Sequence, residues 1–298
     1  MALNRIRTVT VVGAGTMGEG IAQGFAQAGL AVRLVDSNAE TLESCRVRIK
    51  DNLKLMKEYR LLKESLSRTL ERIAPVQIDD LDAALKGSDC VDETIPEILE
   101  VKKELFARLD RLPRDVMLAS NTSSIPITEI ARDMETPERV IGVHYFNPAH
   151  LLPLVEIHCG ERTAVAVVEA ASRLMRRIGK NPILIKKAIP GFVINRITGA
   201  MMREIYHLLD EGVATAEEID IAVKNSTGLK LGCFGPMELE DMAGLDVAYR
   251  VHSRTFQTLD NRRIPSPLLL EKADRGELGY KSGKGWLDYA GTPCRDEG

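Results

Sequence analysis

Residues 8–36 read TVTVVGAGTMGEGIAQGFAQAGLAVRLVD. The run 8–12 is apolar and β-branched, which is typical of a buried parallel strand. After the glycine-rich turn, apolar residues recur at helical spacing from Ile21 to Ala28, and residues 31–35 form a second apolar run that ends on Asp36. This order of strand, turn, helix and strand predicts a Rossmann-type doubly wound sheet, and therefore an α/β fold.

The turn itself carries the pattern GxGxxG. Gly13 permits a tight turn, Gly15 lets the backbone approach a pyrophosphate, and Gly18 lets the helix pack closely on the strand. A glycine-rich turn without a ligand is the simpler interpretation, but the strand before it and the acidic residue 23 positions after Gly13 favour a dinucleotide site. The helix N-terminus would face the phosphates with unpaired amides. We expect the cofactor to contact Gly13, Gly15, Thr16, Met17, Gly18 and Asp36.

Asp36 indicates which dinucleotide binds. Its carboxylate would accept hydrogen bonds from the ribose hydroxyls and would repel a 2′-phosphate. The next residue is Ser37 and not an arginine, so the sequence predicts NAD rather than NADP.

Composition narrows the class of protein. The 298 residues suggest two domains, and 44% hydrophobic and 28% charged residues are ordinary for a globular protein. A net charge of −3 gives no indication of nucleic acid as a partner, and no apolar run has membrane-spanning length. The five cysteines are scattered, which predicts free thiols and no metal site. The opening MALNRIR has no apolar leader, so we expect a cytoplasmic protein.

Residues 38–72 lack glycine and proline and carry leucines at roughly helical intervals, which predicts an inserted helical hairpin. From Arg46 to Arg72 there are nine basic and four acidic residues, a local net charge of 9 − 4 = +5. Such a projection could attract a polyanionic substrate tail, but on this feature alone a solvated helix face with i,i+4 ion pairs is the favoured interpretation.

Further strands are predicted at 76–78, 90–91, 116–119 and 182–187. The strand 116–119 ends on SNTSS, a run of small polar residues at the sheet edge where open α/β folds bind ligands. Helical patterns alone follow Pro190-Gly191, at 192–209, 216–223, from 235 and at 265–273. We therefore divide the chain into a dinucleotide-binding domain, 1–188, and an all-α domain, 189–298, that contacts substrate and forms a homodimer.

The stretch 140–156, VIGVHYFNPAHLLPLVE, reads as two strands joined by a loop. His144 lies near the end of the first strand and Glu156 within the second. If the strands are neighbours, the carboxylate can hold one ring nitrogen and leave the other as a general base. A buried histidine with a structural acceptor is the alternative.

Taken together, these motifs resemble the 3-hydroxyacyl-CoA dehydrogenases over nearly the whole chain. The matching segments, in order, are the glycine turn with Asp36, SNTSS at 120–124, HYFNP at 144–148, LVE at 154–156, PGFVINR at 190–196, GPMEL at 235–239 and KSGKG at 281–285. The resemblance implies a short-chain (S)-3-hydroxyacyl-CoA substrate and NAD as the hydride acceptor.

The resemblance also implies roles for single residues. His144 would take the hydroxyl proton and Glu156 would orient it, while Ser123 and Asn195 would bind the reacting oxygen. The residues matching cofactor contacts of the family are Glu97, Lys102, Asn147 and Lys281, and Lys54 and Lys57 of the hairpin would hold the CoA moiety.

Two positions depart from the acyl-CoA pattern. Pro153 stands where the family usually places a lysine before LVE, and Tyr59 falls near a lysine position that contacts CoA. Together with His150, Pro153 resembles related dehydrogenases of CoA-free hydroxy acids, such as the carnitine and gulonate types. A dehydrogenase of a free hydroxy acid or heterocyclic alcohol is thus the alternative function, and a catalytically silent NAD-binding protein is a third.

Overall fold

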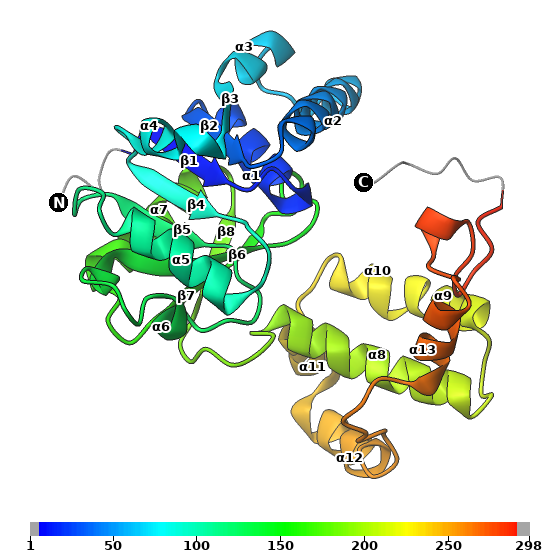
Figure 1. Ribbon diagram of the computed structural model, residues 1–298. Coiled ribbons are helices and arrows are strands. Elements are labelled where there is room, and N and C mark those ends of the chain that lie inside the picture. Colours follow the sequence, from blue (N-terminus) through cyan, green and yellow to red (C-terminus); the bar gives the residue numbers. More distant parts are fainter. Residues whose placement is uncertain (1–5, 291–298) are drawn as a thin grey trace. The chain divides into compact units, whose positions relative to one another are not determined.

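The computed structural model of the chain describes residues 6–290 (Figure 1). Cys294 and most of the N-terminal segment on which the expectation of a missing leader rests lie outside this range. The chain divides into two compact units, with the boundary between Val193 and Ile194. Each unit is described by itself.

The first unit is built on one eight-stranded sheet with the order β3-β2-β1-β4-β5-β6-β7-β8. Every neighbouring pair is parallel except β6 and β7, which run antiparallel. The strands are β1 (Thr8–Val12), β2 (Ala31–Asp36), β3 (Ile73–Gln77), β4 (Cys90–Glu93), β5 (Met117–Ser120), β6 (Val140–Tyr145), β7 (Leu154–Cys159) and β8 (Asn181–Ile185). The doubly wound Rossmann-type sheet is thus confirmed. Strands β2 and β3 extend the sheet on one side of β1, and after β3 the chain returns to place β4 on the other side of β1, as this fold requires.

Helices cover both faces of this sheet (Figure 1). They are α1 (Thr16–Gln27), α2 (Ala39–Glu58), α3 (Leu66–Glu71), α4 (Leu81–Leu85), α5 (Leu99–Leu109), α6 (Ile127–Ile130) and α7 (Val165–Arg177), with 3₁₀ turns η1 (Ile78–Asp80) and η2 (Pro137–Arg139). One core cluster joins α1, α2 and α7 to the sheet through residues such as Phe25, Ile49 and Leu174. The other joins α4, α5 and α6 through residues such as Phe106 and Ile130. Apolar side chains alternate between the two clusters along the strands, because successive residues of a strand face opposite sides.

The inserted hairpin consists of α2 and the shorter α3. Asn38 caps α2 by accepting the N–H groups of Glu40 and Thr41, and residues 59–65 separate the two helices. The buried residues of α2, which include Leu42, Ile49 and Leu53, belong to the core cluster of α1. One face of the hairpin is therefore part of the core, while its charged face meets solvent.

The second unit is helical, as expected. Its elements are α8 (Ile194–Asp210), α9 (Ala216–Lys224), α10 (Thr227–Leu231), α11 (Pro236–Ala243), α12 (Leu245–Thr255), α13 (Pro267–Asp274) and the 3₁₀ turn η3 (Tyr280–Ser282). The sequence pattern did not predict α10 and α12. Gly228 and Gly232 interrupt the pattern of α10, and Gly244 (φ +93°) separates α12 from α11 by a sharp turn that reads as a helix stop.

Among residues 6–290, no helix is long and apolar enough to cross a membrane. No set of three or more His, Cys, Asp or Glu side chains in the same range lies close enough to bind a metal ion. Cys45, Cys90, Cys159 and Cys233 are free thiols.

Asp92 on β4 is a buried acid whose pKa departs strongly from its ordinary value. The Tyr145 hydroxyl donates to Asp92 Oδ2 at 2.9 Å, and only 1% of the residue is exposed. Burial is the largest influence on the carboxyl group; with Glu93 it outweighs the Tyr145 hydrogen bond and raises the pKa of Asp92 to about 7. Since this folded-state pKa lies above the unfolded value, folding takes up a proton at intermediate pH, and stability falls as pH rises from about 4 to about 7.

Asp92→Asn should remove this pH dependence, because an amide stays neutral and can still accept from Tyr145. At pH 8 we expect the variant to be more stable than the parent by about 1–3 kcal/mol, with the difference fading by pH 4. Thermal melts at the two pH values measure it. An equal change at both would contradict the assignment of the proton to Asp92.

Candidate active site

The glycine-rich turn has the shape that a dinucleotide requires. Gly13 adopts φ +109°, and a Cβ there would lie 2.7 Å from Thr94 Oγ1. A Cβ on Gly18 would lie 1.8 Å from the Gly13 carbonyl oxygen, so helix and turn touch directly. Gly15 differs, since nothing lies within 4 Å of a Cβ built there. The backbone at Gly15 is thus open to a ligand, whereas other atoms of the protein fill the space beside Gly13 and Gly18.

Two more features of this turn fit NAD. Gly15 is the N-cap of α1 and provides no side chain to satisfy the first amides, which leaves them for phosphate oxygens. Asp36 ends β2 and accepts the N–H groups of Ala14 at 2.7 Å and Asn38 at 2.9 Å. Its carboxylate therefore lies beside the turn, where a ribose would follow the pyrophosphate. Thr16 and Met17 open α1 at the same place.

His144 and Glu156 face each other across β6 and β7. They are register partners, and His144 Nδ1 lies 2.9 Å from Glu156 Oε2. Glu156 is fully buried, and 6% of His144 is exposed. The second carboxylate oxygen, Oε1, accepts the backbone N–H of Val193 at 3.0 Å. The carboxylate is held at both oxygens, which fixes the orientation of the ring it contacts.

The SNTSS segment forms a loop around Glu97. Glu97 Oε1 accepts the Thr122 hydroxyl at 2.6 Å, the Ser123 N–H at 2.9 Å and the Ser124 hydroxyl at 2.9 Å. Partial burial would raise the pKa of Glu97, but hydrogen bonds from Thr122 and Ser124 and the charge of Lys102 lower it to about 2. Its carboxylate is therefore ionised, and it shapes the loop that carries the Ser123 hydroxyl.

Lys102 lies inside the protein beneath this loop. Its ammonium donates to Glu93 Oε1 at 2.6 Å and lies 3.3 Å from Glu97, while Ser120 donates to Glu93 Oε2 at 2.6 Å. Lys102 is fully buried. In this arrangement it supports the acidic pair, and a contribution to cofactor binding would act through Glu97. Glu93 was not singled out from the sequence, since its only signal is a strand-end carboxylate.

Asn147 follows β6 on an exposed loop and precedes a cis bond to Pro148. The loop packs on α1, because a Cβ on Gly20 would lie 3.0 Å from Ala149 Cβ. The buried Lys180 ammonium also holds the loop, because it donates to the carbonyls of Ala149 and Leu152, the latter at 2.7 Å. Sequence reasoning missed Lys180, whose role depends on a contact 28 residues away.

The remaining predicted residues belong to the hairpin and to the second unit. Lys54 is exposed and pairs with Asp51 at 2.7 Å, and Lys57 is exposed near the end of α2. Asn195, the second residue of α8, and Lys281, in η3, belong to the second unit. Lys281 lines a cavity of about 300 Å³ there, together with Trp286.

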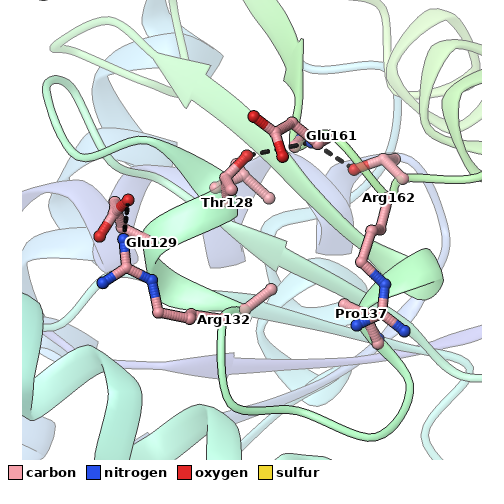
Figure 2. Close-up of a pocket in the computed structure, with 10 residues that line it drawn as sticks. Thr128, Glu129, Arg132, Pro137, Glu161 and Arg162 are labelled. Carbon is pink, nitrogen blue, oxygen red and sulfur yellow. Dashed lines mark hydrogen bonds and ion pairs between the residues drawn. The ribbon is translucent and has the colours of Figure 1, made fainter.

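A separate cavity of about 370 Å³ lies at the other end of β6 and β7 (Figure 2). Gly160 and Glu161 line it and follow the last residue of β7, which pairs with Ile141 at the start of β6. Figure 2 shows Arg132 paired with Glu129 on one wall. Neither His144 nor Glu156 contributes to this cavity, so we do not include it in the site.

Comparison with known proteins places the geometry in a family. The family model of the NAD-binding domain of 3-hydroxyacyl-CoA dehydrogenase matches residues 8–188, and the model of its C-terminal domain matches residues 191–289. A 3-hydroxybutyryl-CoA dehydrogenase of Bradyrhizobium diazoefficiens is 38% identical over 294 residues, covering 96% of this chain and 97% of the relative.

A second similar protein is the 5-formyl-3-hydroxy-2-methylpyridine 4-carboxylate 5-dehydrogenase of Mesorhizobium japonicum, 36% identical over 285 residues that cover 95% of this chain and 91% of the relative. A crystal structure of an enzyme of the same name, described as an NAD⁺-dependent dismutase, has a TM-score of 0.88 at 35% identity, covering 97% of this chain and 92% of that one. With both domains matched and the dinucleotide turn fitting the cofactor, the chain belongs to the 3-hydroxyacyl-CoA dehydrogenase family of NAD-dependent oxidoreductases that act on CH–OH groups.

Proposed function

We propose that the protein oxidises a short-chain (S)-3-hydroxyacyl-CoA to the 3-oxoacyl-CoA, with His144 as the general base. The observation that carries this proposal is the Glu156 carboxylate, buried and bound at both oxygens, with its Oε2 on His144 Nδ1. With Nδ1 occupied, Nε2 is the nitrogen that can accept the substrate hydroxyl proton. Bound NAD⁺ supplies the hydride acceptor.

The chain's own residues would stabilise and orient the reacting oxygen. The Ser123 hydroxyl and the Asn195 amide are donors suited to an oxygen that gains negative charge as its proton leaves. Glu97 holds the Ser123 backbone, so that hydroxyl starts from an ordered loop. Glu156 stabilises the imidazolium that forms on His144, and the burial of the pair strengthens this interaction.

The hairpin offers a place for the CoA phosphates. Four of its nine basic residues are ion-paired, namely Arg48, Lys54, Arg68 and Arg72. Lys57 and Lys63 have no ion pair within residues 6–290, and they line an open cavity of about 320 Å³ between α2 and α3. An exposed pair of lysines beside a cavity suits an anionic tail better than the neutralised Lys54 does.

The test is acetoacetyl-CoA reduction by NADH, monitored by absorbance. Lys57→Gln combined with Lys63→Gln should raise KM for this substrate about 5–10-fold with little change in kcat. Lys54→Gln is the matched control, because Asp51 already offsets its charge, and its KM should stay near the parent value. Absence of turnover with acetoacetyl-CoA, while a CoA-free hydroxy acid is oxidised, would refute the acyl-CoA substrate.

A second candidate is a CoA-free hydroxy acid or heterocyclic alcohol. It is favoured by Pro153 and His150 and by the similarity to the pyridine carboxylate dehydrogenase. It uses the same base and cofactor, so it predicts turnover that does not change when Lys57 and Lys63 lose their charges.

We also propose that the second unit forms a homodimer. Of the hydrophobic side chains described in residues 194–290, only Ile219 and Ala248 are buried, whereas Met237, Met242 and Tyr249 are each more than 60% exposed. A helical unit with so little core of its own needs a second surface to cover its apolar faces. Light scattering after size exclusion should give twice the chain mass, and a monomer at micromolar concentration would contradict it.

A further inference from the structure

His158 is a buried imidazole that the proposed mechanism does not use. It follows Glu156 by two residues on β7, so its side chain leaves the same face of the sheet as the His144–Glu156 pair. No part of it is exposed. Within residues 6–290 neither ring nitrogen meets ordinary hydrogen-bond geometry, and a weak contact with the Thr122 backbone raises the pKa of the ring only against larger opposing influences. A polar ring buried in this way costs free energy, and its place beside the base calls for a physical reason.

The ring of His158 rests on the backbone of β6. Its register partner is Gly142, and a Cβ built on Gly142 would lie 2.0 Å from His158 Nε2. Only glycine leaves room for the ring. Burial, and then the neighbouring His144, lower the pKa of His158 to about 4. At neutral pH the side chain is therefore an uncharged flat ring.

Phe192 packs against this ring. The centroids of Phe192 and His158 are 4.2 Å apart, and Phe192 also lies 5.6 Å from His144. Phe192 is 3% exposed and adopts φ +44°, a conformation that a bulky residue keeps only where its surroundings hold it. This tilted ring contact with His158 is thus one of the contacts that hold the Phe192 backbone.

The residue after Phe192 provides the link to the base. The Val193 N–H donates to Glu156 Oε1 at 3.0 Å, and Glu156 Oε2 contacts His144. The height of Phe192 above β6 therefore sets where this N–H meets the carboxylate. Gly142, His158, Phe192, Glu156 and His144 form one continuous set of contacts.

We propose that His158 is a positioning residue for the general base: it acts as a flat spacer between β6 and Phe192 that places the Val193 N–H on Glu156. It transfers no proton, and the two ring nitrogens take no part. The inference rests on the proposed function, since it requires His144 to be the base.

The first test removes the ring. His158→Ala should lower kcat about 10–100-fold while the NADH Kd, measured by NADH fluorescence, stays within about twofold, because the dinucleotide turn is untouched. His158→Phe should restore most of kcat, since it returns a flat ring to the same place. If the His158→Phe variant binds NADH normally but is as slow as His158→Ala, the ring nitrogens are needed and the spacer role is overturned.

The second test moves the ring without changing it. Gly142→Ala should displace the imidazole and lower kcat to a similar extent. The double variant Gly142→Ala/His158→Ala should lose no more activity than His158→Ala alone, because no ring remains to be displaced. Losses that multiply would show that Gly142 and His158 act independently and would overturn the proposal. Should the alanine variants fail to fold, His158→Phe decides by the same NADH and kcat measurements: retained kcat supports the spacer, lost kcat overturns it.

His144→Gln in the same assay distinguishes failure of the His158 inference from failure of the proposed function. If it abolishes turnover while a folded His158→Ala is fully active, this inference alone is wrong. If His144→Gln is as active as the parent, the base assignment fails, and the inference falls with it.

Discussion

His144→Gln is expected to lower kcat by a factor of about 10²–10⁴, because the glutamine amide cannot accept the substrate proton. NADH binding should be unchanged, since the dinucleotide turn lies on other strands of the sheet. Glutamine can still donate to Glu156 Oε2, so the buried carboxylate keeps a partner and the variant should fold. Turnover under saturating substrate and the NADH Kd together measure the effect.

His252→Gln is the matched control. His252 Nε2 also contacts a carboxylate, Glu240 Oε1, at 2.7 Å, but that pair lies on the second unit and is more than a third exposed. The same chemical change should leave kcat within about twofold of the parent. An enzyme equally indifferent to both substitutions would support a different base or a catalytically silent protein.

Gly18→Ala is expected to be the most damaging single change to the fold. The new methyl would lie 1.8 Å from the Gly13 carbonyl oxygen, and backbone on both sides must move to admit it. We expect a loss of about 3–5 kcal/mol in the free energy of unfolding, together with the loss of NADH binding. Chemical denaturation and NADH fluorescence report the two effects separately.

Gly15→Ala should weaken NADH binding without lowering the stability of the protein. Nothing in the protein lies within 4 Å of the added methyl, so stability without cofactor should stay within about 0.5 kcal/mol of the parent. The methyl would stand where the pyrophosphate approaches, and NADH affinity should fall at least about 10-fold. Gly24→Ala, with an equally open Cβ within α1, is the control: it should leave NADH affinity unchanged and raise stability by about 0.5–1 kcal/mol through helix propensity. If Gly15→Ala bound NADH normally, the turn would not be the pyrophosphate site.

Much of the fold could be predicted because its signals are local. The dinucleotide turn, its helix and Asp36 lie within 29 consecutive residues, and each glycine has a recognisable task. The alternation of apolar strands with helical segments was enough to predict a doubly wound sheet and an all-α second part. Strand ends were less certain: β3 begins at Ile73, three residues before the predicted start, since Pro75 reads as a break in the pattern.

Only part of the candidate site could be predicted from local sequence signals. His144 and Glu156 could be paired because a short loop joins their strands, and antiparallel neighbours of this kind are common. The basic charge of the hairpin was counted correctly, yet its sum could not show that Asp51 offsets Lys54. The difference matters, because it moves the expected phosphate contact to Lys57 and Lys63.

The sequence by itself determined the sheet, the dinucleotide turn and the pairing of His144 with Glu156, because periodicity, glycine spacing and short loops are properties of neighbouring residues. Only the tertiary structure decided what holds that pair. These contacts are the Val193 N–H on Glu156, the His158 imidazole against Gly142 and Phe192, and Lys180 on the Asn147 loop. They join residues 16 to 37 positions apart. Such contacts depend on how the chain returns across the sheet, and no local pattern encodes the distance between two atoms that meet there.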